Sequence, residues 1–452
     1  MLIKPSIIHI LLVGYMLLIA FAFRNFLRFD VTLLLGIAIL PTLFLASEKR
    51  VQWSVFWLTP LWVLTVWTTS YTLMYFAIIG SLIWSYSRFI GKLSALPVLL
   101  LLTISPVFSY VTDVFSFDLR LKMTAFSVEI LKRTDAHAEK IDPSVYQANL
   151  GTFQALGNII RLPNGEEWLI DAACMGLNML GVGLILAYFF IGFFSKQQQK
   201  LPTNRGIAVF ITAALCLNLL SNLTRILAVV LLKIAPATVG HELIGLLSFL
   251  MYGVVPMYFF IKINRTSSFF FKEKVKNDAF SMASTKVSLR SFIVPIGLFV
   301  CLVSRALFFE FYKKTEINLV LPDTLTAHFT VNNLPNGVTQ LRNDSTLIYL
   351  KNLPNGFTTE HSPMICWQGS GYTFQKIERI MIGKTSVYLG ILQRESDQIH
   401  AIWWFESDNF ATSDQIAWRY RALTEGSHFR LVNVNAASKE QVVVAAKKWL
   451  GK

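Results

Sequence analysis

Long apolar runs recur along this chain of 452 residues, and several are long enough to cross a lipid bilayer. A transmembrane helix needs about 20 consecutive, predominantly apolar residues. The sequence therefore predicts a polytopic α-helical membrane protein with about nine transmembrane helices. We expect the spans near residues 5–23, 31–46, 52–69, 71–86, 93–111, 172–194, 206–234, 240–261 and 291–309.

Composition and charge agree with a membrane protein. Charged residues make up 15% of the chain, whereas soluble proteins carry about 25%. The net charge of +14 is explained by basic cytoplasmic loops, so no nucleic-acid partner is needed. The distribution of lysine and arginine between the loops predicts that the N-terminus is inside and the C-terminus outside. We interpret residues 1–23 as an uncleaved first helix rather than a signal peptide.

Turn signals divide the parts of the chain outside the membrane. We expect a membrane core over 1–309, in which 112–171 is an extracytoplasmic segment ending in a β-hairpin at Asn164-Gly165. Residues 310–452 are predicted to form an extracytoplasmic α+β domain in which the same Asn-Gly signal occurs twice. Its expected strands are 346–351, 386–393 and 399–405, and its expected helices are 413–424 and 438–449.

Three chemically distinctive residues fall on three successive predicted spans. Cys174 begins the sixth span, Arg225 lies near the end of the seventh, and His241 begins the eighth. The predicted topology puts all three at the outer face. A cysteine and a histidine form a nucleophile–base pair, and an arginine is a charged donor for a tetrahedral oxyanion.

Each residue also has a simpler interpretation when it is taken alone. Cys174 fits a buried, inert thiol, Arg225 fits a side chain that reaches the headgroups, and His241 fits an interfacial histidine. Asp171 is a candidate N-cap that places Cys174 near unpaired backbone N–H groups. Asn222 lies one turn before Arg225 and is expected to orient its guanidinium.

Metal and phosphate chemistry find no support in the sequence. The seven histidines are scattered without the close spacings of zinc sites, and no Gly-rich phosphate loop with its lysine is present. We expect no cofactor.

These motifs resemble those of the exosortase/archaeosortase family, membrane enzymes with a Cys, Arg, His triad on successive helices. The similarity rests on order, spacing and flanking residues, and the departure is Met175, where serine is usual. The matching stretches are Gly157-Asn158-Ile159-Ile160-Arg161-Leu162-Pro163-Asn164-Gly165, Ala173-Cys174-Met175-Gly176-Leu177, Asn222-Leu223-Thr224-Arg225-Ile226, and His241 with Gly245.

The C-terminal domain resembles the periplasmic domain associated with bacterial exosortases. The match is residues 362–372, and it is imperfect because Gln368 and Tyr372 replace proline and tryptophan. Cys366, with His361 nearby, is a candidate second site or a merely structural thiol. An appended domain is typical of divergent types such as exosortase N.

The resemblance implies a function at the bacterial cytoplasmic (inner) membrane. Cys174, Arg225 and His241 would be catalytic, with Asp171, Gly176 and Asn222 in support. Substrates would be secreted proteins ending in a sorting motif, a transmembrane helix and a basic tail, with membrane lipid around the site. The cleaved chain would pass to an amine acceptor or to water, and the sequence does not choose between them.

Two other functions compete with cleavage. A transporter or exopolysaccharide-export component would use Arg225 and His241 as substrate or proton sites, but no duplicated half or paired broken helices are evident. A scaffold without activity would use residues 310–452 to bind partners.

Overall fold

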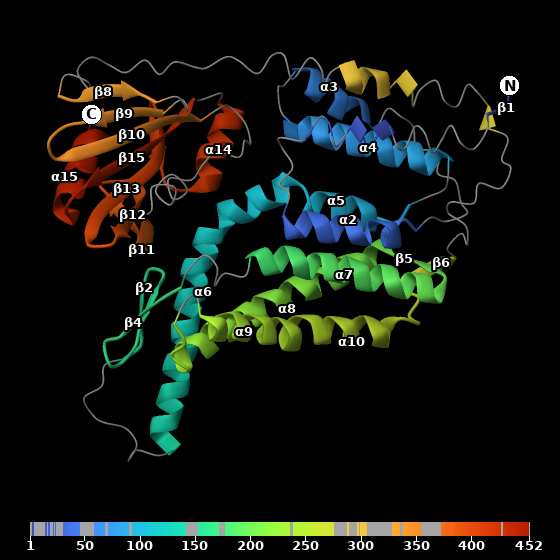
Figure 1. Cartoon of the computed structure of the whole chain (residues 1–452), viewed down its shortest axis with the longest axis horizontal. Helices are drawn as coiled ribbons and strands as arrows, with labels where there is room; N and C mark the ends of the chain where they lie inside the picture. Colours follow the sequence, from blue (N-terminus) through green and yellow to red (C-terminus); the bar gives the residue numbers. More distant parts are fainter. Residues whose placement is uncertain are drawn as a thin grey trace. The chain divides into compact units, whose positions relative to one another are not determined.

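The computed structural model forms two compact units (Figure 1). The first unit contains residues 1–113 and 173–314, and the second contains residues 114–172 and 315–452. The domain division predicted at residues 309/310 follows membrane topology and stays a prediction. The structure describes residues 2–3, 14–15, 17–18, 21, 23, 30–45, 58–67, 71–89, 93–141, 152–170, 177–235, 238–274, 287–288, 296–297, 299–304, 328–334, 338–353, 372–425 and 428–451.

The described part of the first unit is largely helical. Helices α7, α8 and α9–α10 lie side by side (Figure 1), and two short antiparallel strand pairs, β1–β7 and β5–β6, accompany the helices. The helices are α2 (Val31–Leu43), α3 (Thr59–Trp67), α4 (Tyr71–Phe89), α5 (Leu96–Thr103), α7 (Leu177–Gln198), α8 (Asn204–Leu231), α9 (Val239–Ser248), the π-helical η4 (Phe249–Val254) and α10 (Val255–Asn264). The short strands are β1 (Leu2–Ile3), β5 (Lys200–Pro202), β6 (Phe271–Lys274) and β7 (Val287–Ser288).

Three helices of the described residues are long and apolar enough to cross a membrane. They are Met179–Gln198, Asn204–Leu231 and the continuous helix Val239–Asn264. Shorter apolar helices occupy Val31–Leu43 and Thr72–Ser87. The chain is therefore an α-helical membrane protein with a β-sheet domain, whereas the predicted number of nine spans is not confirmed.

The predicted span at 93–111 is wrong in one respect, because it is interrupted. Helix α5 ends at Thr103, and α6 (Pro106–Ile141) begins after two intervening residues and continues for 36 residues. Proline lacks a backbone N–H, so it is well tolerated in the first turn of a helix and tends to kink or break the interior. The hydroxyl of Ser105 donates to the carbonyl of Leu102 at 2.6 Å. The break therefore follows from Ser105-Pro106.

The last apolar helix contains a wide turn before a proline. Residues Phe249–Val254 are π-helical, and Pro256 follows at the start of α10. In a regular α-helix the proline ring would clash with the carbonyl four residues earlier. The π-helical segment accommodates the proline without ending the helix, so residues 239–264 still form one span-length element.

The predicted hairpin at Asn164-Gly165 is present, within a three-stranded antiparallel sheet of the second unit. The strands are β2 (Gln154–Leu156), β3 (Ile159–Arg161) and β4 (Glu167–Leu169). The turn type differs from the expected one, because Gly165 has a φ of +87° whereas Asn164 does not have a positive φ. The N–H of Gly165 donates to the carbonyl of Leu162 at 2.9 Å, as in a type I turn followed by a left-handed glycine.

The C-terminal domain is built on an antiparallel sheet with the strand order β11-β12-β13-β15-β10-β9-β8 and β14 beside β13. The predicted strands and helices of this domain are confirmed, each with boundaries shifted by no more than a few residues. The strands are β8 (Thr330–Asn333), β9 (Val338–Arg342), β10 (Thr346–Leu353), β11 (Thr373–Ile382), β12 (Thr385–Arg394), β13 (Asp397–Ser407), β14 (Phe410–Thr412) and β15 (Phe429–Ala436), and the helices are α14 (Gln415–Thr424) and α15 (Lys439–Leu450).

Apolar side chains cover both faces of this sheet. Strand β12 shows the alternation, since Val387 and Leu389 pack with α15 whereas Tyr388 packs with α14 on the opposite face. Figure 1 shows α14 and α15 flanking the sheet. Leu121 of α6 also packs against the α14 side. Because both faces are buried, the edge strands β11 and β8 are where the sheet offers backbone groups.

Candidate active site

Arg225 lies near the C-terminal end of α8. The helix begins at the N-cap Thr203, whose hydroxyl accepts from the N–H of Gly206 at 3.0 Å, and it ends at Leu231. The side chain of Arg225 is buried, with the residue 5% exposed. An arginine inside a membrane segment is expensive and faces the protein interior or a wet cavity. Its burial argues against the interpretation in which it extends to the headgroups.

His241 lies in the first turn of α9, at the end of the bundle where α8 finishes. The hydroxyl of Thr238, the N-cap, accepts from the N–H of His241 at 3.3 Å. This cap was missed in the sequence analysis, although a threonine before a new apolar run is a helix-start signal. The histidine is 2% exposed, so its ring is inside the unit rather than at an open interface.

The two buried side chains meet. Nη2 of Arg225 lies 3.4 Å from Nδ1 of His241. A guanidinium can only donate, so this contact requires Nδ1 to accept, with the proton of the neutral ring on Nε2. The carboxylate of Glu242, which is largely exposed, lies 3.7 Å from the same Nδ1. Nδ1 therefore has a donor and an acceptor within reach, and its tautomer depends on which one it engages.

Because Gly245 has no side chain, the guanidinium of Arg225 can pack directly against α9. A Cβ built on Gly245 would lie 2.8 Å from both Cζ and Nε of Arg225. Gly245 is one turn after His241, so the arginine packs directly on the backbone of the helix that carries the histidine. From the sequence Gly245 is recognisable only as part of a motif, and the close approach of Arg225 supplies its physical reason.

The expected contact between Asn222 and Arg225 is not made. Asn222 is 7% exposed, and its Oδ1 has no hydrogen-bond partner among the described residues. A buried acceptor without a donor costs about 1–3 kcal/mol. One turn from Arg225, this oxygen is an acceptor that a polar ligand could satisfy.

The remaining candidate residues lie outside the described residues. These are Asp171, Cys174, Gly176, His361 and Cys366. Helix α7 begins at Leu177, three residues after Cys174 in the chain. Because α7, α8 and α9 follow one another as packed neighbours, the start of α7 and the Arg225–His241 pair belong to the same end of the bundle.

Residues 44–258, which contain this pair, match the family model for the transmembrane exosortase, Exosortase_EpsH. The membrane region of this chain belongs to the transmembrane exosortase family. The exosortase is thus a membrane protein of protein sorting and processing, in a family that acts on secreted proteins with sorting signals. No curated protein and no solved structure matches the chain. The family match ends before the C-terminal domain, whose resemblance to an exosortase-associated domain stays a prediction.

The end of the bundle opposite the Arg225–His241 pair carries basic groups around a cavity. This cavity has a volume of about 510 Å³ and is lined in part by Ser94, Thr203, Arg205 and Lys272. Neither Arg225 nor His241 lines this cavity, so its basic groups are separate from the candidate site. Among the described residues, no group of three His, Cys, Asp or Glu side chains could hold a metal ion.

Proposed function

We propose that this exosortase is a membrane-embedded cysteine protease or transpeptidase that cleaves C-terminal sorting signals of secreted proteins. The supporting observation is the buried contact between Arg225 and His241, at the end of the bundle where α7 starts just after Cys174. A buried guanidinium beside a buried imidazole is a poor packing choice for a purely structural helix contact. It is a suitable arrangement for charge that develops during acyl transfer.

Each residue has one chemical task in this proposal. The sulfur of Cys174 attacks the scissile carbonyl carbon as its proton moves to His241, and Arg225 donates to the oxyanion that forms. His241 passes a proton to the leaving amine as the carbon–nitrogen bond breaks. The resulting thioester on Cys174 is then attacked by an amine or by water, which releases the thiol.

The proton on the neutral His241 ring must move from Nε2 to Nδ1 before the ring can act as a base. In the contact with Arg225, Nδ1 accepts and Nε2 carries the proton. When Arg225 turns toward the substrate oxyanion, Nδ1 can carry a proton toward the Glu242 carboxylate, which lies 3.7 Å away. Nε2 then has the lone pair that a general base needs. Glu242 would therefore select the reactive tautomer.

The substrate fits the position of the site. A secreted protein ending in a motif, an apolar helix and a basic tail would lie in the bilayer beside the bundle, with the motif at the outer interface. The unsatisfied Oδ1 of Asn222 would accept from an amide N–H of the motif. We place the exosortase in the cytoplasmic membrane of a bacterium, with its N-terminus inside and the C-terminal domain outside.

A covalent intermediate tests the proposal directly. The probe is a secreted protein from the same genome that ends in a shared motif, helix and basic tail, supplied to membranes that contain the full-length exosortase. Neutral hydroxylamine attacks a thioester and leaves a hydroxamate on the released carbonyl. We expect the shortened substrate to carry a C-terminal hydroxamate, measured by mass spectrometry. Continued cleavage without any hydroxamate would contradict a thioester on Cys174.

Gly245→Ala tests the place of the guanidinium. The added methyl group must displace Arg225 from His241, since it would lie 2.8 Å from Cζ. A displacement of about 1 Å in a catalytic group can cost about 100-fold in rate, so we expect kcat to fall by about 10- to 100-fold. The measurement is the initial rate of substrate shortening at equal enzyme level. Gly297→Ala is the control, because a Cβ there meets nothing within 4 Å, and equal rates for both variants would contradict the assignment.

A further inference from the structure

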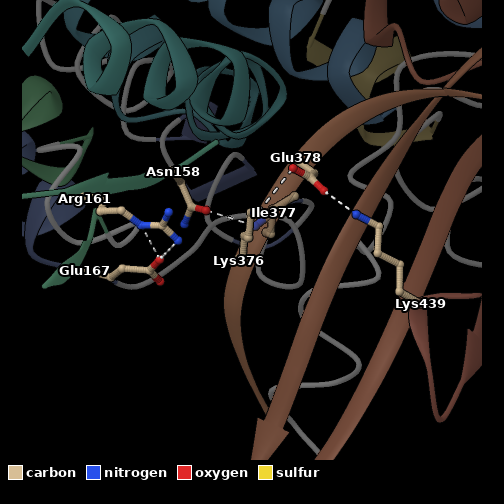
Figure 2. A network of polar contacts seen from close by, with 7 residues as sticks. All are labelled: Asn158, Arg161, Glu167, Lys376, Ile377, Glu378 and Lys439. Carbon is tan, nitrogen blue, oxygen red and sulfur yellow. Dashed lines mark hydrogen bonds and ion pairs between the residues drawn. The ribbon is translucent and has the colours of Figure 1, made fainter. Parts of the chain in front are cut away.

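The tight turn between β2 and β3 docks on the edge of the C-terminal sheet. Oδ1 of Asn158 accepts a hydrogen bond from the backbone N–H of Ile377 at 2.9 Å (Figure 2). Asn158 is 1% exposed and Ile377 is fully buried. The two residues are 219 positions apart in the chain, and both belong to the second compact unit. This is a long-range contact within one unit.

The hydrogen bond uses a group that the sheet leaves open. Strand β11 is at the edge of the sheet and pairs with β12 on one side only. An edge strand presents alternate N–H and C=O groups outward, where they need a partner when they are buried. Asn158 supplies the acceptor for one of these groups, so its side chain replaces a neighbouring strand at this point.

Gly157 allows the backbone of the turn to come close to β11, because it has no side chain. Its φ is +66°, the sign that the first central position of a type II′ hairpin turn requires. A Cβ built on it would lie 2.5 Å from the carbonyl oxygen of Ile377. Both residues of the Gly157-Asn158 turn therefore fit direct contact with β11, and Gly157 is close enough to exclude any side chain.

Asn158 also holds the end of the small sheet that leads to Cys174. Its backbone carbonyl accepts from the N–H of Ile170 at 2.8 Å. Ile170 is 2% exposed and precedes Cys174 by four residues. Through one residue, the C-terminal domain is thus joined by hydrogen bonds to the segment that enters the cysteine motif.

The exposed ion pairs around this turn are weaker anchors. Arg161 pairs with Glu167 within the hairpin at 2.5 Å, with both side chains more than 40% exposed. Figure 2 shows that this pair joins β3 to β4, whereas Asn158 reaches β11. Glu378 of β11 is paired within its own domain, to Lys376 and Lys439 at 3.4 Å each. Ion pairs open to solvent contribute little. None of these pairs joins the hairpin to β11, so the buried amide is the contact that matters for docking.

We infer that Asn158 is a positioning residue through which the C-terminal domain holds the segment leading to the nucleophile Cys174. This inference rests on the proposed function. The appended domain is accordingly part of the catalytic apparatus, and it acts on turnover rather than on substrate capture. Loss of the Asn158–Ile377 hydrogen bond frees the segment while the helices that carry Arg225 and His241 stay packed.

The test compares Asn158→Ala, Asn158→Asp and Arg161→Ala in the full-length protein. Losing a buried hydrogen bond changes an equilibrium on the order of 10-fold, so we expect kcat of Asn158→Ala to fall by about that factor with KM unchanged. Asn158→Asp keeps the acceptor oxygen and should recover most of the rate. Arg161→Ala removes a side-chain partner in the same sheet and should resemble the unmodified protein. If Asn158→Ala does not accumulate in membranes, Asn158→Gln, which displaces the oxygen by one methylene, takes its place.

A second readout does not depend on cleavage. Alkylation of Cys174 by iodoacetamide is followed peptide by peptide at pH 7 in detergent, with the exposed Cys216 and Cys301 as internal references. We expect the rate at Cys174 to fall on the order of 10-fold in Asn158→Ala, because a freed thiol is no longer held beside the base that activates it, while the reference rates stay constant. Unchanged or faster alkylation, an unchanged kcat, or equal losses in the Ala and Asp variants would overturn the inference. A failure of the proposed function would instead appear as an unmodified protein that does not cut the substrate.

Discussion

Cys174→Ala is expected to leave the C-terminal helix of the substrate uncut. In the proposed reaction the sulfur forms the bond that replaces the scissile amide, and neither Arg225 nor His241 can take over that task. Loss of a nucleophile from a catalytic triad lowers kcat by about 10⁴-fold or more, since only binding and oxyanion stabilisation remain. The measurement is the fraction of full-length and shortened substrate on a gel, with the enzyme level matched by immunoblot.

Cys216→Ala is the matched control for this variant. Cys216 lies in α8, the helix that carries Arg225, and its side chain is exposed. Its removal should leave cleavage unchanged, which separates loss of the nucleophile from a general effect of cysteine replacement. Normal processing by Cys174→Ala at a normal enzyme level would defeat the assignment of the nucleophile.

The convergence of Arg225 and His241 could be expected from sequence, because it depends only on where the helices begin and end and on which helices are neighbours. Apolar runs set the helix lengths, short connections make successive helices antiparallel neighbours, and the ends of the runs then fix which residues share one end. The strands of the C-terminal domain could also be predicted, because the apolar runs of β12 and β13 are bounded by turn residues. These are local patterns with a strong periodic signal.

Contacts that depend on side-chain packing could not be predicted from these local patterns. Asn222 lies one turn before Arg225, yet its oxygen does not meet the guanidinium, which instead packs at Gly245 on the next helix. The docking of Asn158 on Ile377 joins positions 219 residues apart, and no local pattern encodes such a pair. The interruption at Ser105-Pro106 was visible in the sequence, but the span was predicted from its apolar residues alone.

Arg225→Gln is expected to lower kcat by about 10²–10³-fold, the usual loss when one oxyanion donor is removed. Glutamine retains a donor but neither the charge nor the length of the guanidinium, which packs on α9 and reaches Nδ1 of His241. Arg225→Lys should also be impaired, because an ammonium lacks the planar fork that can donate to two partners at once. The measurement is the initial rate of substrate shortening at saturating substrate, where a change in kcat is separated from one in KM.

Arg205→Gln separates this effect from the loss of a positive charge on the same helix. Arg205 lies in the first turn of α8, at the end of the helix opposite Arg225, and its side chain is exposed. The two substitutions change the net charge of the protein equally, but only one removes a donor beside His241. Cleavage should therefore be normal in Arg205→Gln and defective in Arg225→Gln. If Arg225→Gln instead raised KM and left kcat intact, the guanidinium would bind the substrate in its ground state, and the oxyanion role would have to be given to another donor.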